Sequence, residues 1–215
     1  MAHPIRVLVE ITPKKAFASA LDWPGLSRAG RDGPSALTAL AAALPRYAQV
    51  ASAASVAFDV HAPLKVAEEA PGDATTAFGA PAVVAAADRV LTTAADGERL
   101  GALVAACWAA LAASAAAAPE ELRKGPRGGG RSRDKVVAHV TDAEAAYAAV
   151  MGLRARPVDA AGVAAMRTAI LDLLRTPSDG APLAGKRWPA RYAARRIAWH
   201  ALDHAWEIED RAEPE

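Results

Sequence analysis

Residues 197–206 read Ile-Ala-Trp-His-Ala-Leu-Asp-His-Ala-Trp, and this spacing is typical of a helix with two different faces. At about 100° per residue, His200 and His204 share a side with small and aliphatic residues, where a core helix places its apolar side chains. Pro189 fits the first turn of such a helix, which we expect to run to about Arg211. The face with the histidines comprises Ala193, Ile197, His200, Ala201, His204 and Ile208.

The opposite face of this helix is apolar as well, because it carries Trp199, Leu202 and Trp206. A large apolar patch normally contacts another part of the protein or a partner. We therefore expect either the N-terminal part of the chain or the second subunit of a homodimer to pack on the two tryptophans.

A third histidine lies inside an apolar stripe farther upstream. His139 shares helical spacing with Tyr147 and with three valines. Since an unpaired buried polar group costs roughly 1–3 kcal/mol, three buried imidazoles need partners. One divalent metal ion supplies a partner to all three, and a site with three protein ligands keeps an open coordination position. The alternative is that each histidine is hydrogen-bonded separately. The spacing favours a metal site on His139, His200 and His204.

Four helical segments separated by breakers fill the second half of the chain. We expect them at about residues 96–118, 133–151, 157–175 and 189–211. Four amphipathic helices joined by short loops are most simply arranged as an antiparallel four-helix bundle. The predicted fold class is α+β, with the bundle in a domain of residues 96–215.

Residues 1–95 form the other predicted domain, a small β-rich α+β module. Extended runs at residues 5–12 and 16–21, joined by a turn, predict a small antiparallel sheet. Asp32 and Pro34 have the positions of an N-cap and a first-turn proline, and Pro45 should end or kink the helix that they begin. A further strand is expected at residues 55–60.

Composition limits the function. The 215 residues contain 25 Lys plus Arg and 24 Asp plus Glu, and the resulting net charge of +1 argues against a nucleic-acid partner. A single cysteine, Cys107, forms no intrachain disulfide, and no export signal is visible, so we expect a reduced, cytoplasmic protein. Alanine accounts for 59 residues, which favours closely packed helices. The uncharged residues 101–118 carry their large side chains in one stripe, which indicates a core helix rather than a membrane partner.

The histidine segments resemble those of a known family. Together with residues 137–144, which read Val-Ala-His-Val-Thr-Asp-Ala-Glu, the stretch at 197–206 resembles the DinB-like superfamily of four-helix-bundle metalloproteins. The resemblance covers about residues 96–211. It implies that His139, His200 and His204 bind a divalent ion, commonly zinc or nickel, and that the protein is related to S-transferases and isomerases that use small thiols such as mycothiol. Separately, residues 18–30 resemble the β-β-α modules of HicB-like antitoxins.

Other residues are candidates for contacts with substrate or with the metal ligands. An arginine-rich, glycine-rich loop precedes the second helix of the predicted bundle, and a helix N-terminus offers free N–H groups to an anion. An acidic thiol or a carboxylate would fit there, although a solvated loop is the alternative. Three of the candidates, Arg127, Arg131 and Arg133, lie in or beside this loop. The other three, Asp142, Tyr147 and Glu207, lie on the predicted helices that carry the histidines.

The sequence thus predicts a divalent-metal-dependent enzyme of the DinB-like type that acts on a small molecule, as a mycothiol-like thiol S-transferase or isomerase. No catalytic base is identifiable, and we expect Cys107 to be a core residue. The competing prediction is a non-enzymatic protein, either one stabilised by its metal or a HicB-like regulator that acts through protein contacts.

Overall fold

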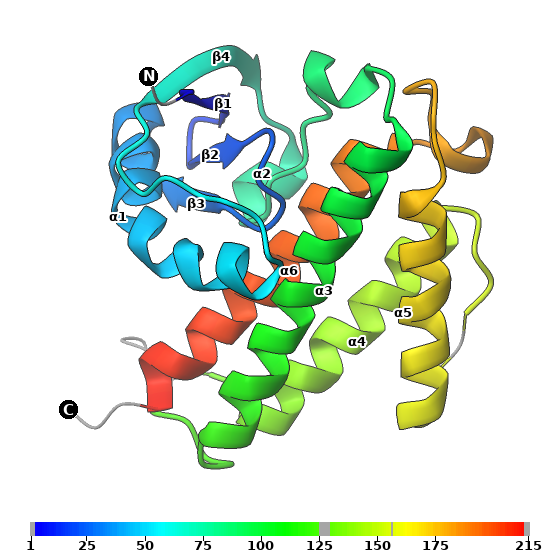
Figure 1. Ribbon diagram of the computed structural model, residues 1–215. Coiled ribbons are helices and arrows are strands. Elements are labelled where there is room, and N and C mark those ends of the chain that lie inside the picture. The colour runs from blue at the N-terminus through cyan, green and yellow to red at the C-terminus, as the bar shows by residue number, and fades with distance from the viewer. Residues whose placement is uncertain (1–2, 125–129, 156, 213–215) are drawn as a thin grey trace.

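The computed structural model describes residues 3–124, 130–155 and 157–212, which form an α+β protein with one four-stranded mixed sheet and six α-helices (Figure 1). This confirms the α+β part of the predicted fold class. The strands are β1 (Ile5–Ile11), β2 (Ala16–Ala20), β3 (Ser27–Gly30) and β4 (Leu64–Pro71). The helices are α1 (Gly33–Ala53), α2 (Ala74–Phe78), α3 (Ala94–Ala117), α4 (Arg133–Val150), α5 (Ala160–Arg175) and α6 (Ala190–Ala212).

The sheet has the order β3-β2-β1-β4, and it is mixed rather than wholly antiparallel as predicted. β2 is antiparallel to both β1 and β3, whereas β4 pairs with β1 in parallel. The reason is topological. β3 runs in the same direction as β1, and α1 carries the chain back along the sheet, as a crossover between parallel strands requires. The next strand therefore repeats the direction of β3 and of β1.

The strand predicted at residues 55–60 is also wrong, since these residues form turns and irregular backbone and β4 begins only at Leu64. Ser55 has a left-handed φ of 56° directly after α1. Phe58 then packs edge-on against Trp23 and Tyr47, with ring centroids 4.7 and 5.2 Å apart. The apolar side chain of Phe58, which in the sequence suggested a strand, packs in this aromatic cluster instead.

Helix α1 begins as predicted but does not end at Pro45. Asp32 caps its N-terminus by accepting a hydrogen bond from the Ser35 N–H, and Pro34 lies in the first turn. The helix continues through Pro45 to Ala53. An interior proline costs about 3 kcal/mol or more. Tyr47 is fully buried and donates a hydrogen bond of 2.7 Å to the Pro24 carbonyl, so packing beyond the proline offsets that cost.

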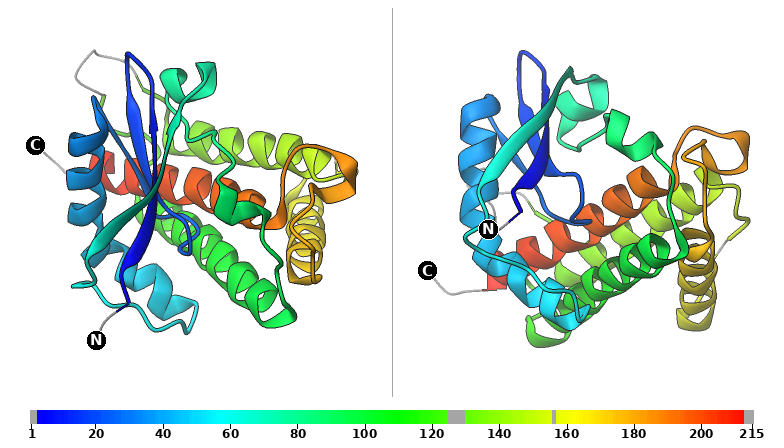
Figure 2. Two further views of the ribbon diagram at one scale, coloured as in Figure 1. Left: turned by 90° about the horizontal axis from the view of Figure 1, so that it is seen from above. Right: turned by 45° about the horizontal axis from the view of Figure 1, so that its top comes forward.

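The helices of the second half lie within a few residues of their predicted positions. α3 contacts α6 and α5, and α4 packs on α6. The sheet and α1 lie to one side of α3 and α6, and α5 lies to the other (Figures 1 and 2). One continuous core includes Val7 and Leu40 as well as Val104, Ile170 and Ile197, so the packing is unbroken across residue 95.

Helix α3 is the one helix in the described part of the chain that is long and apolar enough to cross a membrane, and half of its most apolar segment is buried inside the protein. The stripe of large side chains predicted to face the core does so. Its members are Leu100, Leu103, Val104, Cys107, Trp108 and Leu111, all of which are buried.

The N-terminal region packs on the face of α6 that carries Trp199 and Trp206. Of the two partners predicted for this face, the N-terminal part of the chain is therefore the one observed. Phe17 of β2 packs edge-on against Trp199, with ring centroids 5.9 Å apart. The guanidinium groups of Arg28 and Arg46 lie 5.2 and 4.9 Å from the ring of Trp206. This packing fixes the rotation of α6 and turns its histidine face toward α4.

Candidate metal centre

Helices α4 and α6 bring three histidines together. His200 and His204 are one turn apart on α6, and His139 faces them from α4. The ring centroids are 4.7 Å apart for His200 and His204, 5.0 Å for His139 and His200, and 5.1 Å for His139 and His204. One ligand atom of each side chain lies within 4.8 Å of those of the other two, as a shared metal ion requires. The sequence spacing predicted this convergence.

His200 is the most deeply buried of the three, with 7% of its surface exposed. Burial is the largest of the effects that lower its pKa to about 2, and repulsion from a protonated His204 and from Arg196 contributes less, so the imidazole is neutral near pH 7. Its Nδ1 atom is buried and has no hydrogen-bond partner among the described residues. A neutral imidazole with an unpartnered buried nitrogen has the protonation state that a metal ligand needs.

His204 is held by a carboxylate. Its Nδ1 lies 2.7 Å from Oε2 of Glu207, and Oε1 of Glu207 accepts a hydrogen bond of 2.8 Å from Arg211. The hydrogen bond to His204 is the largest of the effects that lower the pKa of Glu207, so this carboxylate is ionised and accepts the Nδ1 proton. This hydrogen bond leaves Nε2 as the nitrogen of His204 available to a metal ion, in the arrangement that carboxylates give to metal-binding histidines.

His139 is half-buried. Burial lowers its pKa, and the positive charge of Arg131 adds to this effect, while Asp142 opposes it. Asp142 itself is exposed. Tyr147 is half-buried, and its ring centroid lies 5.7 Å from that of His200. Tyr147 thus stands beside the histidines, whereas Asp142 acts on them only through its charge.

The three loop arginines take different positions. The backbone carbonyl of Arg131 accepts a hydrogen bond from Arg211, and its side chain is exposed. Arg133 is paired with the neighbouring Asp134 and donates to the carbonyl of Ala118. Arg127 lies outside the described residues. Of the two arginines that the structure describes, Arg131 acts electrostatically on the histidines and Arg133 does not.

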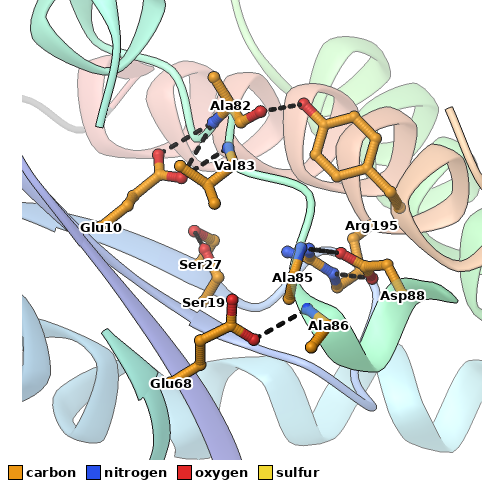
Figure 3. A network of polar contacts seen from close by, with 11 residues as sticks. Glu10, Ser19, Ser27, Glu68, Ala82, Val83, Ala85, Ala86, Asp88 and Arg195 are labelled. Carbon is orange, nitrogen blue, oxygen red and sulfur yellow. Dashed lines mark hydrogen bonds and ion pairs between the residues drawn. The ribbon is translucent and has the colours of Figure 1, made fainter. Parts of the chain in front are cut away.

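A buried polar network that sequence reasoning missed holds residues 79–89, here called the strap, between the sheet and α6 (Figure 3). Glu10 is fully buried on β1 and accepts hydrogen bonds of 2.9 and 2.8 Å from the backbone N–H groups of Ala82 and Val83. Asp88 forms a buried, two-pronged ion pair with Arg195 of α6. The available signal was the glutamate at position 10, which directly follows the apolar run Val7–Val9 of β1.

Cys107 is fully buried beside Pro24, and burial raises the pKa of its thiol. A buried thiol that resists ionisation is a core residue, not a nucleophile.

Comparison with known proteins identifies no matching family, no matching curated protein and no matching solved structure.

Proposed function

We propose that this protein is a divalent-metal-dependent enzyme that acts on a small thiol, as an S-transferase or isomerase, and that α3 to α6 constitute a DinB-like four-helix bundle. The observation that carries the proposal is the convergence of His139, His200 and His204, one of which has a buried nitrogen without a partner in the part of the chain that the structure describes. Burying that nitrogen unpaired costs roughly 1–3 kcal/mol, which a bound metal ion removes.

The donor set fits a divalent ion such as zinc or nickel. Three imidazoles with a carboxylate behind one of them are typical of catalytic zinc sites, which retain an open position for water or substrate. Zinc binds histidine nitrogen at about 2.0–2.1 Å, so the ligands of a tetrahedral site lie about 3.4 Å apart. The ligand atoms of the three histidines already lie within 4.8 Å of one another.

The chain's own residues have defined tasks in this proposal. The three histidines hold the ion, which when bound lowers the pKa of a coordinated thiol. Glu207 orients His204, and Arg211 orients Glu207. In the transfer itself the thiol gives its proton to solvent, and its sulfur forms a bond to an electrophilic carbon as the leaving group departs with the electron pair.

Cobalt(II) substitution tests this function directly. Addition of a small thiol to the cobalt-loaded protein is expected to produce a thiolate charge-transfer band, and the His200→Ala and His204→Ala variants are expected to lose it while their circular dichroism stays unchanged. The matched control is His61→Ala, since His61 is exposed and outside the cluster. Cobalt binding without any thiol band would overturn the thiol chemistry and leave a structural metal site.

A further inference from the structure

A guanidinium group stands beside the histidine cluster, on the same two aromatic rings as His200. The guanidinium carbon of Arg196 lies 5.4 Å from the ring centroid of Tyr147 and 5.0 Å from that of Trp199. The ring centroid of His200 lies 5.7 Å from the first and 5.9 Å from the second. Arg196 and His200 are also one turn apart on α6, so they are neighbours along one side of the helix.

Arg196 differs from the other arginines of α6 in having no carboxylate. Arg191 pairs with Asp96, Arg195 with Asp88 and Arg211 with Glu207. Within residues 3–124, 130–155 and 157–212, Arg196 forms no ion pair, and its one hydrogen bond to the main chain runs 3.0 Å from Nη1 to the carbonyl of Pro81. A guanidinium has five N–H donors, and apart from the bonds to the Pro81 carbonyl and to the Tyr147 hydroxyl, no described carboxylate takes them up.

The surroundings hold this guanidinium in a fixed place. Pro81 belongs to the strap, which Glu10 and the pair of Asp88 with Arg195 fasten to the sheet and to α6 (Figure 3). Two aromatic faces add cation–π attraction without neutralising the charge. A cation held in advance loses less conformational freedom when a ligand binds.

We propose that Arg196 binds an anionic group of the ligand whose thiol sits at the histidine cluster, which makes the substrate an acidic thiol such as a mercaptocarboxylate. The inference rests on the proposed function. Arginine matches a carboxylate with two parallel hydrogen bonds, and charge-assisted bonds of this type are the strong ones. Arg133, which the sequence offered for the same task, is already paired with Asp134.

Three thiols with the same two-carbon linker test the assignment on the cobalt-loaded protein: 3-mercaptopropionate, 2-mercaptoethanol and cysteamine, with 4-mercaptobutyrate as a longer anion. Dissociation constants come from the thiolate charge-transfer band. Comparing variant with wild type for each thiol cancels the different acidities of the thiols themselves.

Arg196→Met keeps the length of the side chain and removes its charge. For whichever of the two anionic thiols the wild type binds more tightly, we expect the dissociation constant to rise about tenfold or more. The dissociation constant of 2-mercaptoethanol should change less than threefold, and that of cysteamine should stay the same or fall. Arg196→Lys should restore part of the preference for the anion. The matched control, Arg133→Met, should change none of the values. Thermal melting verifies that each variant is folded.

Equal losses for neutral and anionic thiols in Arg196→Met, or no loss for either, would overturn the role of Arg196 while the proposed function stands. Absence of a band with every thiol on a cobalt-loaded wild-type protein would overturn the thiol chemistry and the assignment together.

Discussion

At the scale of single residues, two of the histidines have the properties of a metal ligand for different reasons. His200 is neutral because it is buried, with a pKa of about 2, and His204 is oriented by an ionised carboxylate. These two effects differ in kind, since burial sets the protonation state and the hydrogen bond sets which nitrogen is free. Substitution of the carboxylate therefore changes metal affinity without changing the ligands.

Glu207→Gln is the substitution that isolates this orientation. We expect it to weaken metal binding by about 10- to 100-fold, as observed when a carboxylate behind a histidine ligand is removed. Competition against a chromophoric chelator measures the affinity. The control is Glu69→Gln, because Glu69 is exposed on β4, outside the two helices that carry the histidines. An equal loss in both variants, or none in Glu207→Gln, contradicts the role of Glu207.

Sequence reasoning reached the histidines but not all of their surroundings. Helical spacing alone places His200, His204 and His139 in apolar stripes, so their convergence was predictable. The sequence led us to expect Arg133 to contact a substrate, but its guanidinium group is paired with the neighbouring Asp134. Arg196 escaped notice for the opposite reason: only the three-dimensional structure shows that it has no acidic partner among the residues described.

At the scale of elements, the strap depends on a buried ion pair. Arg195 and Asp88 are both almost completely inaccessible, and they join α6 to a segment more than 100 residues earlier in the chain. Removing one partner of such a pair typically costs about 3–5 kcal/mol, because the other charge stays buried without compensation. Replacing both partners costs much less.

A double-mutant cycle tests this account of the strap. Arg195→Met and Asp88→Asn should each lower the free energy of unfolding by about 3 kcal/mol, and the double variant by clearly less than the sum of the two. Urea denaturation gives the values. Arg31→Met is the control. Because its ion pair with Asp32 is exposed, we expect the urea midpoint of unfolding to stay unchanged. Strictly additive losses in the cycle would show that the pair does not hold the strap.

The helices were predictable from sequence and the sheet was only partly so. The four segments of the second half carry long periodic patterns with clear breakers, and they match α3 to α6. β4 has an irregular pattern of burial at the edge of the sheet, so no alternation marks it in the sequence. The predicted end of α1 at Pro45 was wrong because it depended on local helix propensity alone. The burial of Tyr47 beyond the proline stabilises the continuous helix.

At the scale of the whole molecule, the two halves of the chain are built around α6. One of its faces is covered by the sheet through Phe17 and Trp199, and the other carries His200 and His204 toward α4. The core continues through both halves. The N-terminal region therefore supports the histidine cluster from behind and, through Pro81, holds Arg196 beside it.

The central claim is that one divalent ion binds to the three histidines, and metal content by mass spectrometry on tag-free protein tests it most directly. We predict about one zinc or nickel ion per chain in the wild type and in His61→Ala, and its loss from His200→Ala and His204→Ala without unfolding. Wild-type protein that binds no divalent ion even after reconstitution would contradict the claim, and the three histidines would then be core residues only.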